Sequence, residues 1–143
     1  MKTLLAAMLV ALALPVLAVA AVAGGHVRIV AWASAGSGKE SKDPPKNAVA
    51  GGTLCTPAKI TKLVAYVRFD GMHNGDPSSA DWFYNGKKVY SFPFKWEDGS
   101  SGKTAFDLHK ASATLDAGRY GIQVRTNGRQ VGAAAIALKY GGC

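Results

Sequence analysis

Apolar and polar residues alternate with the two-residue period of half-buried β-strands over much of the chain. Ile60–Phe69 is the longest such segment, and Thr104–Leu108 and Tyr120–Val124 repeat the pattern. The stretch Asp70–Ala80 is rich in glycine, proline and polar residues and predicts a loop. Outside the N-terminal apolar run, no segment has the apolar spacing of an amphipathic helix, so the pattern predicts a sheet protein.

Two Asn-Gly pairs predict β-hairpins. Each lies between apolar runs, and the two central residues of a type I′ turn both require positive φ, which Asn and Gly tolerate. The first turn joins Asp81–Tyr84 to Lys87–Trp96. If the strands pair without irregularity, the expected partners are Tyr84 with Lys87, Trp82 with Val89, Thr126 with Arg129, and Val124 with Val131.

About seven short strands with closely spaced turns are typical of an all-β antiparallel sandwich. An open barrel such as an OB-fold is the alternative architecture for the same pattern.

The N-terminal residues have the order of parts expected of a secretory signal peptide. Lys2 precedes an apolar run from Leu4 to Ala23, with small residues suited to cleavage after Ala20 or Ala23. An uncleaved anchor is the alternative, because about 20 apolar residues can span a bilayer. Pro15 divides the run, and this favours a signal peptide rather than an anchor. The signal peptide is predicted to comprise residues 1–20. No second long apolar stretch follows, so no membrane span is expected after cleavage.

The next segment, 21–52, is predicted to be a flexible arm that precedes the domain. His26–Trp32 alternates well enough for one short strand, whereas Ser34–Gly52 is rich in Gly, Ser, Lys and Pro without any period. The folded domain is therefore expected to occupy 53–143.

Cys55 and Cys143 are the only cysteines. In an exported protein such a pair is most simply a disulfide, which would constrain the unfolded chain by about 4 kcal/mol. A free thiol or an intermolecular bond, with an oligomer as its result, are the alternatives. The expected location is the periplasm or the exterior of the cell.

Two local motifs resemble immunoglobulin-type domains. Trp82–Lys87 is similar to a strand C tryptophan followed by its turn, and Asp116–Tyr120 is similar to the tyrosine corner before strand F. Ile122 stands where a strand F cysteine would be, and the segment around Val67 has no cysteine either. The chain therefore looks more like the small immunoglobulin-like modules of bacterial envelope proteins, a resemblance that implies the sandwich and a tyrosine hydroxyl bonded to the backbone just upstream.

No segment predicts an active site, a cofactor or a metal site. Ala35–Glu40 lacks the first glycine and the final Ser or Thr of a P-loop, and Asp70–Asp76 lacks the alternating oxygen ligands of a calcium loop. The three histidines are far apart and share no motif with a nucleophile. The protein is therefore predicted not to be an enzyme.

A row of aromatic residues is the strongest candidate for a binding site. Four alternate along the second strand of the first hairpin: Tyr90, Phe92, Phe94 and Trp96. Lys88 and Lys95 flank them, and the expected register places Trp82 on the opposite face. Either face could be the core, and Pro93, which has no N–H to donate, places the strand at an edge or at a bulge that would exchange the faces.

If this row is exposed, its rings and lysines form a surface for a protein or an anionic glycan of the cell envelope. The net charge of +8 favours anionic partners, and export argues against nucleic acid as one of them. The sequence thus predicts an exported, non-enzymatic binding module. The alternative is a structural subunit of a surface assembly, whose N-terminal arm adds a strand to a neighbouring sheet.

Overall fold

The computed structural model describes residues 24–34 and 41–143. The predicted signal peptide and both candidate cleavage positions lie outside these residues. Within them there is no helix, and therefore none with the length and apolar character needed to cross a membrane.

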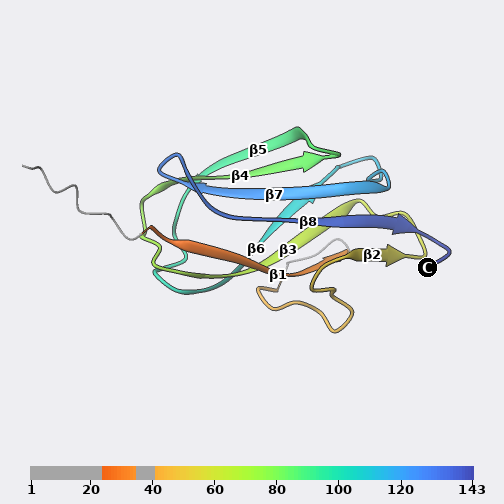
Figure 1. The fold of residues 1–143 in the computed structure, drawn as a ribbon, viewed down its shortest axis with the longest axis horizontal. Coiled ribbons are helices and arrows are strands. Elements are labelled where there is room, and N and C mark those ends of the chain that lie inside the picture. The colour runs from red at the N-terminus through yellow and green to blue at the C-terminus, as the bar shows by residue number, and fades with distance from the viewer. Residues whose placement is uncertain (1–23, 35–40) are drawn as a thin grey trace, which may run out of the picture.

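Eight strands form two sheets that pack face to face (Figure 1). The strands are β1 (His26–Ser34), β2 (Thr53–Thr56), β3 (Lys62–Asp70), β4 (Pro77–Tyr84), β5 (Lys87–Lys95), β6 (Gly102–His109), β7 (Gly118–Thr126) and β8 (Arg129–Tyr140). One sheet has the order β1-β3-β6 and the other β2-β8-β7-β4-β5. The predicted loop after Asp70 is shorter than expected, because β4 begins at Pro77.

This strand order is that of an immunoglobulin-like sandwich. The run β8-β7-β4-β5 corresponds to strands G-F-C-C′, and β1-β3-β6 corresponds to A-B-E. Ile122 and Val67, which stand where an inter-sheet disulfide would be, belong to the core. In the same core Trp82 packs edge-on against Trp32, with ring centroids 6.2 Å apart. The predicted all-β sandwich is confirmed, and an indole pair from the two sheets supplies apolar contact across them.

Both Asn-Gly turns are confirmed. Asn85 and Asn127 have φ of 47° and 52°, and the glycines that follow them also have positive φ. The expected register holds next to each turn and is wrong further along, because each hairpin contains a bulge. Trp82 faces Tyr90 instead of Val89, and Val124 faces Gly132 instead of Val131.

Three tyrosines hold the loop between β6 and β7. The hydroxyls of Tyr140, Tyr120 and Tyr84 donate to the consecutive carbonyls of residues 115, 116 and 117, at 2.6, 2.7 and 2.8 Å. The Tyr120 bond is the predicted tyrosine corner. Because the three side chains come from β8, β7 and β4, this one loop ties together three strands of the larger sheet.

The Cys55–Cys143 disulfide is present, with Cα atoms 6.1 Å apart. It joins β2 to the residues after β8, and β2 runs parallel to β8. The chain end consequently lies beside β2 (Figure 1).

The expectation of a free arm is wrong for the described part of 21–52. His26–Ser34 is strand β1, which pairs with β3 inside the smaller sheet, and Trp32 is buried in the core. Residues 41–52 are also tied down, by a backbone bridge between Trp32 and Val49 and by ion pairs of Lys42 with Asp98 and Asp43 with Lys103. Their polar composition resembled a linker, but tertiary partners hold them.

The tyrosine corner predicts a loss of stability in alkali. Burial, together with the nearby Tyr84 and Tyr140, raises the pKa of Tyr120 to about 12. A group with a raised pKa stabilises the fold fully below its unfolded pKa, about 10 for tyrosine, and that contribution is lost as pH rises through 12. The temperature of the thermal unfolding midpoint should therefore fall more steeply between pH 8 and 12 for the wild type than for Tyr120→Phe. Equal pH profiles would contradict this assignment.

The disulfide should contribute substantially to stability. Its two cysteines are 88 residues apart, and closing a loop of this length is worth about 4–5 kcal/mol in the chain-entropy model. Urea unfolding of Cys55→Ser/Cys143→Ser should show a loss of this size. The matched control is the wild type under reducing conditions, which should lose a similar amount. A loss below about 1 kcal/mol in both would show that the disulfide adds little to stability.

Candidate binding site at the open side of the sandwich

The bulge in the first hairpin decides which side chains of β5 face the core. Directly paired residues of antiparallel strands point to the same side of a sheet. Tyr90 pairs with the buried Trp82, and Phe92 with the buried Ala80, so both rings point toward the other sheet. Val89 is the extra residue.

The predicted site is therefore divided between two faces. Lys88 pairs with Phe83 and Lys95 with Pro77, positions on the outer face of the sheet, away from the aromatic rings. Trp96 is only 1% exposed and belongs to the core, where it packs edge-on against Phe69 at 4.7 Å. The sequence-based expectation of one continuous aromatic and basic face is wrong, because the bulge exchanges the faces after Lys88.

The aromatic row passes from the surface into the core. Phe92 stacks on Phe94 at 5.7 Å, and Phe94 contacts both Trp96 and Phe106 of β6. Phe94 is partly buried, whereas Tyr90 and Phe92 are each 49% exposed. Phe92 is thus linked to the core through Phe94, while about half of the Phe92 and Tyr90 side chains faces solvent.

These rings line a groove between β5 and β6 of about 350 Å³. We call it the β5–β6 groove; it is lined by Ala80, Trp82, Tyr90, Phe92, Ala105, Phe106, Asp107 and His109. A second hollow of about 200 Å³ continues past Tyr90 and His109 toward Leu115 and Tyr120. The groove exists because, among the described strands, β5 and β6 are the edges of their sheets and have no neighbour on their outer sides.

The opposite side of the sandwich is closed, since β1 contacts both β8 and β2. Three large hydrophobic residues are exposed in the described part of the chain, and all belong to β5: Val89, Tyr90 and Phe92. Exposed apolar strips on edge strands are common sites of association between protein chains.

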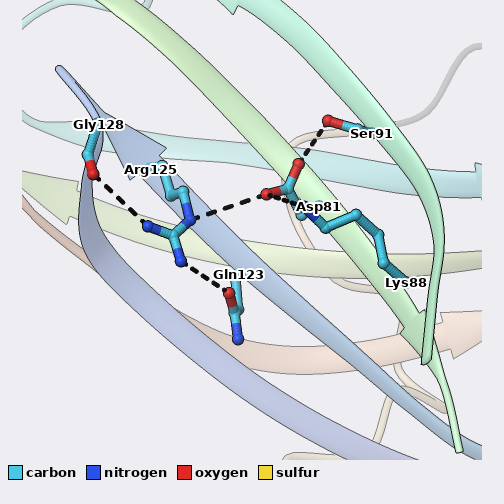
Figure 2. A network of polar contacts seen from close by, with 6 residues as sticks. All are labelled: Asp81, Lys88, Ser91, Gln123, Arg125 and Gly128. Carbon is cyan, nitrogen blue, oxygen red and sulfur yellow. Dashed lines mark hydrogen bonds and ion pairs between the residues drawn. The ribbon is translucent and has the colours of Figure 1, made fainter. Parts of the chain in front are cut away.

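The outer face of the larger sheet carries a separate polar network (Figure 2). The Asp81 side chain is 5% exposed and accepts a hydrogen bond from Ser91 Oγ at 2.6 Å. Lys88 Nζ and Arg125 Nε lie 3.5 and 3.8 Å from its Oδ2. Arg125 is further held by Gln123 Oε1 and the carbonyl of Gly128, at 3.4 and 3.5 Å.

Sequence reasoning did not find Asp81, Arg125 or Phe106 as site residues. Asp81 carried a signal, because an acidic residue between the apolar Ala80 and Trp82 is unusual in the middle of a strand. Phe106 joins the groove only through the packing of β6 opposite β5, and nothing in its local sequence indicates that neighbour.

Comparisons with known proteins give structural likeness alone. No family model matches the chain, and no curated protein matches it. An immunoglobulin-like protein from Pseudomonas aeruginosa is 14% identical and matches 82% of this chain and 98% of its own, with a TM-score of 0.46. The human B7-H4 IgV-like domain is 16% identical over 66% of this chain and 94% of its own, with a TM-score of 0.38.

A Pseudomonas fluorescens alkylpurine DNA glycosylase, AlkC, bound to DNA containing an abasic site analog, is 14% identical over 60% of this chain, with a TM-score of 0.39. The match spans 27% of the glycosylase chain. The fold of the present protein is assigned from its own strand order and register.

The division of the aromatic row predicts opposite outcomes at its two ends. Trp96→Ala removes a buried indole and should cost about 3–5 kcal/mol of unfolding free energy. Tyr90→Ser and Phe92→Ser remove rings that are half in solvent and should cost only about 1 kcal/mol each. Urea denaturation of the three variants checks this, and equal losses at both ends would mean that Tyr90 and Phe92 are core residues.

Proposed function

We propose that this protein is an exported, non-enzymatic binding module that captures a partner protein at the β5–β6 groove. The observation that carries the proposal is the concentration of Val89, Tyr90 and Phe92, half-exposed, on one unpaired edge strand. Soluble proteins bury or interrupt such strips unless a partner covers them.

The mode of capture is strand addition. An extended segment of the partner lies along β5 and places alternate side chains into the β5–β6 groove, where Phe92 and Phe106 provide apolar contact. Pro93, which lacks an N–H, limits the length of pairing toward the end of β5 and so sets the register near Tyr90.

Export is supported from both ends of the chain. The N-terminal sequence has the order of a signal peptide, and the Cys55–Cys143 disulfide is consistent with an oxidising compartment such as the periplasm or the cell exterior. A partner is accordingly expected among proteins of the same compartment.

Strand donation by the N-terminal segment is not proposed. His26–Ser34 already pairs along its length with β3, and Trp32 is buried against Trp82. Releasing that strand would expose the core.

Site-specific cross-linking in the producing cells tests the proposal. A photoreactive phenylalanine analogue at position 92 should form a covalent adduct with a second protein, whereas the same analogue at Arg119, on the outer face, should not. With the partner identified, Tyr90→Ser/Phe92→Ser should weaken binding by about 2 kcal/mol or more, roughly 30-fold.

The matched control changes two exposed residues of the second hairpin, Arg129→Ser/Gln130→Ser, and should leave affinity unchanged. Slowed amide exchange in β5 upon binding should accompany capture, because strand addition protects edge amides. Equal loss in the control variant, or adducts at position 119 alone, would place recognition elsewhere.

A further inference from the structure

The outer face of the larger sheet, opposite the β5–β6 groove, is basic. Outward positions of β5 and β7 carry four cations: Lys88, Lys95, Arg119 and Arg125. In the fully described strands β4, β5, β7 and β8, Asp81 is the one acidic residue at an outward position. This face therefore holds a surplus of positive charge that the neighbouring side chains do not neutralise.

The cations stand in two rows on either side of β4. Lys88 and Lys95 lie on β5, and Arg119 and Arg125 lie on β7. Since adjacent strands are about 4.8 Å apart, the backbones of β5 and β7 are separated by roughly 10 Å. Lys88 Nζ and Arg125 Nε reach inward over β4 and lie 3.5 and 3.8 Å from the same Asp81 oxygen, so these two groups are closer together than their strands. Arg119 lies near the level of the Asn85 turn, and Lys95 pairs with Pro77 at the other end of β4, so the rows extend over roughly 25 Å at about 3.3 Å per residue.

Asp81 lies between the rows and holds one cation from each. Its buried carboxylate is fixed by Ser91, and from there it orients Lys88 on one side and Arg125 on the other (Figure 2). The Lys88 and Arg125 side chains are 54% and 41% exposed, so each keeps donors for a ligand while its position is restricted. Asp81 is a positioning residue for these two groups.

The outer face continues past Arg119 and Arg125 over β7 and β8. A shallow depression of about 440 Å³ is lined by Phe83, Gly121, Gln123 and the alanines of 133–135, among others. The Lys88 ammonium lies 5.9 Å from the centre of the Phe83 ring. Because this cation covers the ring, the face offers no free aromatic platform for stacking bases.

From this arrangement we infer that the outer face binds a linear acidic polysaccharide along β4. In an extended 1,4-linked chain of uronic acids, the carboxylates project alternately to the two sides, which suits cations in two rows. Lys88 and Arg125 form charge-assisted hydrogen bonds with successive carboxylates. This inference does not depend on protein capture at the β5–β6 groove.

The probe is polygalacturonate, with its methyl-esterified form as the neutral control on the same backbone. Calorimetry at low salt should detect binding of the acid and none of the ester. Lys88→Gln/Arg125→Gln should weaken binding at least about tenfold, since each charge-assisted contact is worth more than a neutral one. The matched control, Arg28→Gln/Arg68→Gln, removes the same charge from the outer face of the other sheet and should change affinity less than about twofold.

The sign of the Asp81→Asn effect separates an organised site from diffuse charge. Removing a carboxylate raises the positive charge of the face, so diffuse attraction would strengthen binding. If Asp81 orients Lys88 and Arg125, binding should weaken about threefold or more despite the added charge. Ser91→Ala, which removes the hydrogen bond that fixes the carboxylate, should act in the same direction and serves if Asp81→Asn does not fold.

Several outcomes would overturn the inference. These are stronger binding by Asp81→Asn, equal losses in the two double variants, or binding of the methyl ester. Tighter binding of single-stranded DNA of equal charge would assign the face to nucleic acid instead.

Discussion

The extra residue Val89 in β5 is the constraint on which both surfaces depend. Side chains of a strand alternate between its faces, so one inserted residue reverses the orientation of everything beyond it. Before the bulge, Lys88 faces outward beside Phe83 of β4. After it, Tyr90 and Phe92 face inward. Without it, Trp82 and the aromatic row would lie on opposite faces of the sheet, and the core could use only one of them.

A rigid frame surrounds this irregular strand. Three tyrosine hydroxyls bind consecutive carbonyls of the β6–β7 loop, the disulfide joins β2 to the chain after β8, and β1 packs beside β8 and β2. Gly118 has a φ of +152°, and a Cβ there would lie 2.6 Å from the Tyr84 ring, so this residue has to be small for the loop to be held. The tyrosine bonds hold one end of the sandwich, and the disulfide and β1 close the side at β2 and β8. The opposite side, formed by β5 and β6, is left open.

The two faces of β5 differ in the chemistry they offer. The inner side presents half-exposed rings beside an unpaired backbone edge, which suits an extended protein segment. The outer side presents ordered cations around a buried carboxylate, which suits an anionic chain. Because one lies between the sheets and the other on the outside of the larger sheet, the two ligands that we propose would not compete for the same atoms.

The sequence by itself determined the strand pattern, both Asn-Gly turns, the tyrosine corner and the disulfide, because each depends on local geometry or on the only available pair of cysteines. Tertiary structure alone decided the bulge at Val89, the burial of Trp96 and the incorporation of His26–Ser34 into the sheet. The aromatic row satisfies the alternation rule in either orientation. Which rings became core was settled by how much apolar surface the facing sheet could cover, and that quantity belongs to the whole fold.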